Sequence, residues 1–264
     1  MTESQSLIQA RALSATAQQG TIFGPLDLTV EAGDLVIVHG ARGSGKSALL
    51  LALAGRFRPL SGSLYINGID AIADPYAAIV HSSVARLGNY VAPEDRLTIS
   101  ESIAERAYLD GISIAAAEDR ANDIEQLLGY CVDRNVEIEQ LDPLTRVVVS
   151  AGLAMLRPTS VVVIDDVDMV VPHSRQFEMF ECLARLTELD GCAIITSAID
   201  ADTAPAGSIR IRLGHKAVPY VAAIHDTPVD IETVDADPDS PDDPDADQPV
   251  DETIITRTTS QHGS

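Results

Sequence analysis

Eight consecutive residues of this chain match the spacing G-x-x-x-x-G-K-[ST], which is the pattern of a phosphate-binding loop. The matching residues are Gly40, Ala41, Arg42, Gly43, Ser44, Gly45, Lys46 and Ser47. Glycines let a backbone wrap closely around phosphates with its N–H groups pointing inward. The lysine of the pattern reaches the β- and γ-phosphates, and the hydroxyl that follows it ligates Mg²⁺. This segment therefore predicts a site for a nucleoside triphosphate.

Two carboxylates follow a short buried strand later in the chain. Residues 161–164 (VVVI) are apolar and β-branched, and Asp165 and Asp166 come directly after them. An acid at the end of a parallel strand is the natural partner of a phosphate loop, because it holds Mg²⁺ through water. We expect Asp165, together with Ser47, to hold the metal, and Asp166 to act as the catalytic residue that polarises the attacking water.

The elements that position these residues are indicated by their hydrophobic patterns. Residues 35–39 (LVIVH), just before the loop, are typical of a strand buried on both faces, and residues 47–57 have the spacing of a helix. That helix would direct the positive end of its dipole at the phosphates. Further strands are expected at residues 26–30, 59–70, 192–196, 209–213 and 218–223. Further helices are expected within residues 98–156, with segments at 115–128 and 143–156, and at residues 174–189.

Strands separated by helices imply a parallel sheet with crossover helices, so the expected fold class is α/β. The long helical stretch, about residues 93–157, is expected to form a subdomain of its own. Ser100, Glu101 and Ser102 are candidates to cap its first helix. The folded domain is expected to span residues 1–225.

Composition separates a tail from this domain. From Asp226 onward the chain has twelve acidic residues, many prolines and a single arginine, Arg257. Such a segment has too little apolar surface to offset its ordering entropy, so residues 226–264 are expected to be disordered. The net charge of the whole chain is −22, which would repel nucleic-acid phosphates, and no nucleic-acid partner is expected.

No membrane or export signal is visible in the sequence. Residues 1–6 lack the basic and apolar regions of a signal peptide, and no apolar run approaches the roughly 18 residues that span a bilayer. Cys131, Cys182 and Cys192 lie far apart, which favours buried thiols in a reducing compartment. If the chain serves a membrane process, the membrane-spanning part is expected to belong to another chain.

The order of these segments resembles the nucleotide-binding domain of ABC transporters over roughly residues 5–215. The resemblance is carried by residues 26–55, which contain the phosphate loop, by SGSLYINGID (61–70), by LTISESI (97–103) and by the run from Leu141 to Asp166. It implies a P-loop NTPase fold, with a RecA-like parallel sheet core, an antiparallel β portion and a helical subdomain. It further implies ATP and Mg²⁺ as cofactors, a dimer of like or unlike cassettes, and a cytoplasmic location at the inner face of a membrane through a separate membrane-spanning subunit.

The signature of that family departs from its pattern here. LSGGQ followed by arginine should begin at Leu141, but the chain has Leu141-Asp142-Pro143-Leu144-Thr145-Arg146. In the family this segment grips the γ-phosphate of ATP on the partner cassette. Asp142 would place a negative charge there, Pro143 has no N–H to donate, and Leu144 would block close backbone approach. We therefore do not expect this segment to complete a partner's site.

Other positions that the resemblance implies are also altered. Asp166 stands in place of the catalytic glutamate and is one methylene shorter. The remaining substitutions are Asn89 for the Q-loop glutamine, Ser197 for the switch histidine, Pro172 for the D-loop aspartate, and Ala17 near the aromatic that stacks on adenine, for which Phe23 or Tyr65 could substitute.

Three functions remain open on these residues. The first is an ATP-binding subunit that is coupled to a separate membrane subunit and hydrolyses ATP weakly. The second is a degenerate cassette that senses nucleotide without ATPase activity and pairs with an active cassette or regulates a membrane partner. The third, an unrelated P-loop NTPase or kinase, is disfavoured by the retained order of segments. Whether the chain is an enzyme stays open at this point.

Overall fold

The structure, a computed structural model, describes residues 6–88 and 90–214. The predictions for Asn89, for a strand at 218–223 and for the tail from residue 226 lie outside this part of the chain. The strands are β1 (Ser6–Ala17), β2 (Gly20–Glu31), β3 (Leu35–His39), β4 (Ser61–Ile66), β5 (Ile69–Asp70), β6 (Ser82–Arg86), β7 (Val161–Ile164), β8 (Ala193–Ala198) and β9 (Ile209–Arg212). The helices are α1 (Lys46–Leu53), α2 (Pro75–Ile79), α3 (Ile99–Asp110), α4 (Ile114–Leu128), α5 (Pro143–Ala154) and α6 (His173–Leu186), with 3₁₀ turns η1 (Ile138–Gln140) and η2 (Val167–Met169).

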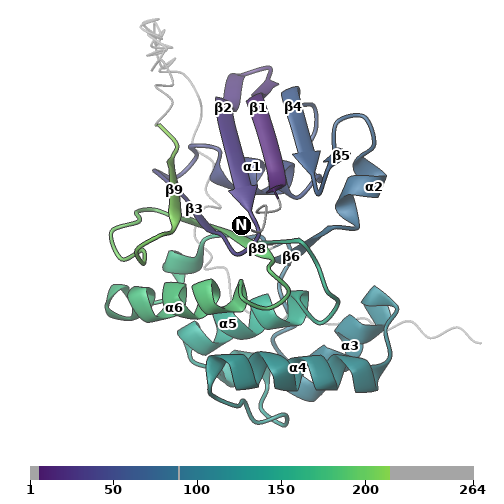
Figure 1. The fold of residues 1–264 in the computed structure, drawn as a ribbon. Coiled ribbons are helices and arrows are strands. Elements are labelled where there is room, and N and C mark those ends of the chain that lie inside the picture. The colour runs from purple at the N-terminus through teal and green to yellow at the C-terminus, as the bar shows by residue number, and fades with distance from the viewer. Residues whose placement is uncertain (1–5, 89, 215–264) are drawn as a thin grey trace, which may run out of the picture. The chain divides into compact units, whose positions relative to one another are not determined.

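A five-stranded parallel sheet forms the centre of the described residues, in the order β6-β7-β8-β3-β9 (Figure 1). Alternate residues of β3 contribute to two different cores. Leu35 and Ile37 pack with the helices α3 to α6, whereas Val36 and Val38 pack with α1 and the second sheet. Burial on both faces explains why β3 and β7 are apolar runs, and the predicted parallel sheet is confirmed.

The second sheet is antiparallel, in the order β2-β1-β4-β5. Its last hairpin turns at Asn67 and Gly68, whose φ angles of 49° and 79° suit the two-residue type I′ turn that this dipeptide predicts. The strand β1 was not predicted, because its alternation is broken at Ala12, where φ is 47° and the register with β2 shifts. With α1 packed between the two sheets, this side of the molecule is the purple and blue part of Figure 1.

Four helices, α3 to α6, cover the other face of the parallel sheet (Figure 1). The first of them begins one turn earlier than a cap at residues 100–102 would place it. Thr98 is the N-cap, and its hydroxyl accepts from the Glu101 amide while the Glu101 carboxylate accepts from the Thr98 amide. The prediction of a cap among residues 100–102 was therefore wrong, because Thr98 is the N-cap. Glu101 nevertheless belongs to the capping box.

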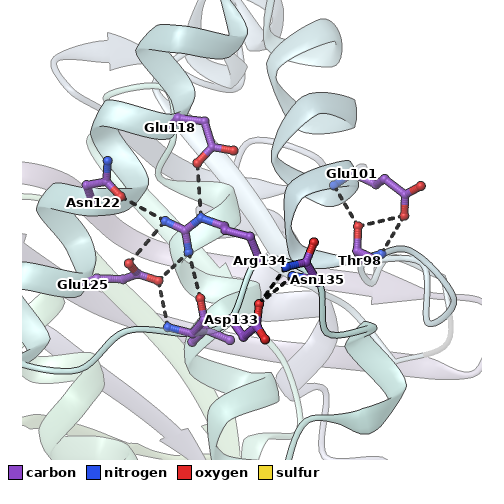
Figure 2. A network of polar contacts seen from close by, with 9 residues as sticks. Thr98, Glu101, Glu118, Asn122, Glu125, Asp133, Arg134 and Asn135 are labelled. Carbon is purple, nitrogen blue, oxygen red and sulfur yellow. Dashed lines mark hydrogen bonds and ion pairs between the residues drawn. The ribbon is translucent and has the colours of Figure 1, made fainter.

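A single arginine fastens the irregular segment after α4 (Figure 2). The guanidinium of Arg134 donates to Glu118 at 3.2 Å, to Glu125 at 2.5 Å and to Asn122 at 3.1 Å, all on α4. It also donates to the carbonyl of Val132, whose own amide binds Glu125. These contacts tie a segment without regular structure to α4, just before the chain turns into η1 and α5.

None of the helices in residues 6–88 and 90–214 is long and apolar enough to cross a membrane.

Candidate nucleotide-binding site

The phosphate loop, residues 40–47, connects the carboxyl end of β3 to the first turn of α1. Gly40, Gly43 and Gly45 have φ angles of 147°, 74° and 98°, which side-chain-bearing residues rarely adopt. Two of them also lack room for a side chain. A Cβ on Gly40 would lie 2.4 Å from the carbonyl oxygen of Leu213, and one on Gly45 would lie 2.3 Å from that of Ile22. The spacing of glycines in the motif is thus dictated by the backbone around the loop.

The lysine of the loop is buried and holds the loop closed. Lys46 is 6% exposed, and its Nζ donates to the carbonyls of Gly40 at 2.9 Å and Ala41 at 3.3 Å. Beside it, the hydroxyl of Ser44 is buried and meets no hydrogen-bond partner among the described residues. The cap position of α1 is Gly45, which has no side chain to occupy the helix N-terminus. A closed loop of positive-φ glycines, an ammonium group and an uncapped helix N-terminus together suit an anionic phosphate chain.

The predicted carboxylate pair lies at the end of β7, as the sequence indicates. Asp165 is 1% exposed, its amide donates to the carbonyl of Arg86 at 3.0 Å, and its Oδ1 accepts from the hydroxyl of Ser197. Asp166 has left-handed backbone geometry (φ 49°), and its amide donates to the same hydroxyl at 2.9 Å. Both acids are therefore placed by a residue at the end of the neighbouring strand β8.

The loop and the carboxylates lie at the same edge of the parallel sheet, because β3 and β7 run parallel on either side of β8. Burial raises the pKa of Asp166, and the nearby charge of Asp165 raises it further, while Lys46 and Arg42 act in the opposite direction. Arg42 also reaches across to Met169 of η2, with its guanidinium 3.9 Å from the sulfur. The positive charge of the loop lysine thus acts on the pKa of the acid that is predicted to be catalytic.

The oxygen groups predicted to hold Mg²⁺ fit that ion chemically. Ser47 is exposed in the first turn of α1, and Asp165 offers a carboxylate whose second oxygen, Oδ2, accepts from no described residue. Hydroxyl and carboxylate oxygens are the hard ligands that Mg²⁺ prefers, usually with several waters retained.

The segment at residues 141–146, which stands in place of the family signature, has backbone amides that are already bound by one of its own carboxylates. Asp142 is the N-cap of α5, and its Oδ1 accepts from the amides of Leu144 at 3.2 Å and Thr145 at 3.5 Å. The Thr145 hydroxyl and the Arg175 guanidinium, the latter at 2.8 Å, also bind this carboxylate. The N-terminus of α5 therefore already carries an anion, and that this segment does not grip a phosphate stays a prediction.

The remaining altered positions lie where the chain order would place them. Ala17 is exposed at the β1–β2 hairpin, whereas Phe23 is buried and packs against Phe57 with ring centroids 6.2 Å apart. Phe23 therefore cannot stack on a base, which corrects one of the two suggested substitutes. Tyr65 lies on β4 beside Gln9 of β1, and Pro172 precedes α6.

Two residues near the site were missed because their partners are distant in sequence. The bond between Ser197 and Asp165 joins residues 32 positions apart, and the sequence pattern presents Ser197 only as a missing histidine. Asp168 accepts from the amide of Ile199 at 2.6 Å through its Oδ2. Only its position three residues after Asp165 could have suggested a role for Asp168.

Comparison with known proteins gives relatives that are matched over part of their length. The cytochrome c biogenesis ATP-binding export protein CcmA of Bordetella parapertussis is 40% identical over 94 residues, which are 36% of this chain and 41% of that protein. The macrolide export ATP-binding/permease protein MacB of a Shewanella species is 28% identical over 197 residues, 74% of this chain and 30% of that protein. The chain thus spans less than half of the length of either relative.

Solved structures of ATP-binding cassettes share the fold. A nucleotide-free cassette from an ABC transporter has a TM-score of 0.61 at 16% identity, covering 75% of this chain and 83% of that one. A dimeric cassette in a post-hydrolysis state, bound to ADP and Pi, has a TM-score of 0.62 at 18% identity, covering 78% and 94%. A family model described as ABC transporter matches residues 23–167, which include the phosphate loop and the carboxylate pair. Because this match extends over more than half of the sequence, the chain belongs to the ABC transporter family.

Proposed function

We propose that this chain binds Mg·ATP at residues 40–47, hydrolyses it slowly and is coupled to a separate membrane-spanning subunit at the inner face of the membrane. The observation that carries the proposal is the placement of a closed phosphate loop and a carboxylate pair at the same edge of the parallel sheet, where β3 and β7 end on either side of β8. Relatives named as ATP-binding proteins of exporters support the assignment.

Each residue of the site has a distinct role in this proposal. The amides of the loop and of the first turn of α1 hold the phosphates. Lys46 leaves the carbonyls of Gly40 and Ala41 and donates to the β- and γ-phosphates. Ser47 and Asp165 hold Mg²⁺, which neutralises phosphate charge when bound. Asp166 orients the attacking water.

Slow hydrolysis follows from the shape of the acid. A carboxylate one methylene shorter than glutamate is displaced from the attacking water, and a misplacement of about 1 Å can cost a hundredfold in rate. The Asp166 amide is also tied to Ser197, so that its backbone cannot shift freely to compensate. These features favour binding over turnover.

The second candidate function is a nucleotide-sensing cassette without ATPase activity. It is favoured by one observation, the closure of the α5 N-terminus by Asp142 and Arg175. In a dimer of two copies of this chain, neither copy would offer free amides at that helix end. A partner cassette with an intact segment would be needed to complete a site, so this function predicts pairing with a different cassette.

A groove beside the parallel sheet supports a protein partner. Two adjoining cavities of about 360 and 140 Å³ share Ala92, Pro93 and Ser150 as lining residues, between the end of β6 and the helices α3 and α5. Leu109 lines the smaller cavity although it is 74% exposed, and the buried hydroxyl of Ser102 there has no partner among the described residues. We propose that a segment of the membrane subunit covers this groove.

Thermal unfolding with Mg·ATP tests the binding. A ligand at 100 times its Kd stabilises a protein by about 2.7 kcal/mol, which raises the Tm of a chain of this size by about 5 to 10 °C. We expect this shift in the wild type and none in Lys46→Ala. Lys46→Met, which keeps an apolar stem in the buried position, controls for loss of packing. An equal shift in all three proteins would contradict nucleotide binding at the loop.

Single-turnover phosphate release separates the two candidate functions. With protein in excess over Mg·ATP, slow release that Asp166→Glu accelerates would support an impaired ATPase. No release from either protein, while both bind Mg·ATP, would support the sensing cassette.

The groove is tested by sedimentation with membranes of the source organism. Leu109→Arg should remain in the supernatant, whereas the wild type should sediment. Tyr76→Arg is the matched control, because Tyr76 is comparably exposed on α2 but does not line either cavity. Loss of sedimentation in both variants would argue against the groove as the contact surface.

A further inference from the structure

The carboxyl end of β8 supports both halves of the candidate site. In the sheet, β8 lies between β3, which leads into the phosphate loop, and β7, which leads into the carboxylate pair. The amide of Gly40 donates to the carbonyls of Ala198 at 3.3 Å and Ile199 at 3.1 Å. On the opposite side, the amide of Ile199 donates to Asp168 at 2.6 Å. One short segment therefore contacts the first residue of the loop and the turn that follows the two acids.

Within this segment, Ser197 makes the contacts to the acids. Its hydroxyl donates to Asp165 Oδ1 and accepts from the amide of Asp166 at 2.9 Å. The side chain is 0% exposed, so water does not compete for these bonds. A hydroxyl has one proton to donate, and here it is committed to Asp165. A single side chain thus fixes both the rotation of the Asp165 carboxylate and the left-handed backbone of Asp166.

We propose that Ser197 is a positioning residue that orients Asp165 toward Mg²⁺. The inference rests on the proposed function, in which Asp165 holds the metal. With Oδ1 held by Ser197, the second oxygen of Asp165, Oδ2, accepts from no described residue and is the one left for the metal. Residues that orient metal-binding carboxylates in this way typically change metal affinity by about 10- to 100-fold when they are replaced.

Thr196 provides a matched comparison on the same strand. It is also 0% exposed, and its hydroxyl donates to the carbonyl of Ile164 at 3.0 Å, not to a carboxylate. Removing either hydroxyl deletes one buried hydrogen-bonding group from β8. A purely structural role for Ser197 would therefore make Ser197→Ala and Thr196→Val behave alike.

The test titrates Mg²⁺ into protein that is saturated with a fluorescent N-methylanthraniloyl analogue of ATP, and measures the affinity for that analogue separately in EDTA. We expect Ser197→Ala to weaken Mg²⁺ binding by about 10- to 100-fold while the metal-free nucleotide affinity stays close to that of the wild type. Ser197→Thr, which keeps the hydroxyl, should retain Mg²⁺ affinity. Thr196→Val should lower the Tm but bind Mg²⁺ as the wild type does.

Wild-type Mg²⁺ affinity in Ser197→Ala, or an equal loss in Thr196→Val, would overturn the proposal and leave the proposed function standing. If the wild type binds the analogue with no dependence on Mg²⁺, the proposed metal site and this inference both fail. Should Ser197→Ala not fold, Ser197→Cys takes its place, since a thiol has nearly the same shape but is a weak hydrogen-bond donor. We expect the same loss of Mg²⁺ affinity in Ser197→Cys as in Ser197→Ala, and wild-type affinity in Ser197→Cys would overturn the proposal.

Discussion

Removing the carboxylate that closes α5 should destabilise the protein by an amount that can be divided into two parts. Asp142 accepts from the amides of Leu144 and Thr145 at the start of the helix and pairs with Arg175. In Asp142→Ala both interactions are lost. In Asp142→Asn the capping function remains, because asparagine caps helices as well as aspartate does, and only the ion pair is lost.

The two parts differ in size. Replacing an N-cap by alanine costs typically about 1 kcal/mol. The ion pair adds less, because the side chains of Arg175 and Asp142 are 43% and 46% exposed, and such pairs contribute about 0 to 1 kcal/mol. Arg175 also keeps its contact with Glu178 at 3.1 Å. We therefore expect a loss of about 1 to 2 kcal/mol in Asp142→Ala and of less than about 1 kcal/mol in Asp142→Asn.

The difference in stability between the wild type and Asp142→Ala should depend on pH in a defined direction. Burial alone would raise the pKa of Asp142, but hydrogen bonds from Thr145 and Leu144 and the charge of Arg175 outweigh it and lower the pKa below its usual value. A depressed folded-state pKa contributes stability that is present above the unfolded-state pKa, about 3.9, and is lost as the pH falls through the folded pKa. The gap between wild type and Asp142→Ala should thus be largest near neutral pH and narrow in acid.

Urea unfolding at pH 7 and at pH 3.5 measures both effects. Equal stability of wild type and Asp142→Ala at pH 7 would refute the capping role. So would an Asp142→Asn variant that is as unstable as Asp142→Ala. Either result would reopen the N-terminus of α5 as a possible phosphate contact.

Three further predictions, made with four substitutions, give separable results. Gly45→Ala should abolish Mg·ATP binding, because its Cβ would lie 2.3 Å from a backbone oxygen of β2. Gly43→Ala, whose Cβ would meet nothing within 4 Å, should cost only about 1 to 2 kcal/mol of left-handed backbone strain. Equal effects of the two variants in a binding titration would contradict the steric argument. Gly152→Ala should raise the free energy of unfolding by up to about 1 kcal/mol, because Gly152 lies inside α5. The added Cβ would meet Ile124 at 3.5 Å, which is an ordinary contact. A lower Tm than that of the wild type would count against this prediction. Asp166→Asn should raise the Tm at pH 7.5, because burial and the neighbouring carboxylate raise the pKa of Asp166. The stability that the protonated carboxyl gives the wild type is lost as the pH rises through that pKa, whereas asparagine stays neutral. The higher Tm of the variant should therefore vanish near pH 3, and its persistence there would contradict the charge argument.

The parts of the site that were predictable are those set by local chemistry. The phosphate loop is predictable because Gly40 and Gly45 occupy positions where the carbonyl oxygens of Leu213, just after β9, and of Ile22 in β2 leave no room for a Cβ. The acids were found because they end the apolar run of β7, which is buried on both faces. Such signals lie within a few residues of the group that they predict.

What was missed depends on partners from elsewhere in the chain. The strand β6 (SSVAR) has little apolar character, yet Ser82 and Ser83 are buried. Their hydroxyls bind the guanidinium groups of Arg56 and Arg106, which makes polar residues acceptable in the interior. No local sequence pattern indicates that a serine will bind a distant arginine. The edge strand β6 of the parallel sheet was therefore not predicted.

Ser197 shows the same limit in the functional site. From the sequence, the position is a missing histidine that one substitution would restore. In the structure the side chain is fully buried and its hydroxyl already binds Asp165 and the amide of Asp166. A histidine there would remove those bonds and would put a much larger side chain at a fully buried position, so Ser197→His is expected to disturb the carboxylate pair rather than to raise turnover.

The central claim is that the loop of residues 40–47 binds the phosphates of Mg·ATP. Calorimetric titration of Mg·ATP into the wild type, Lys46→Ala and Lys46→Met tests it most directly. We predict saturable binding heat in the wild type that both substitutions abolish. Absence of heat in the wild type, or binding that survives both substitutions, would contradict it.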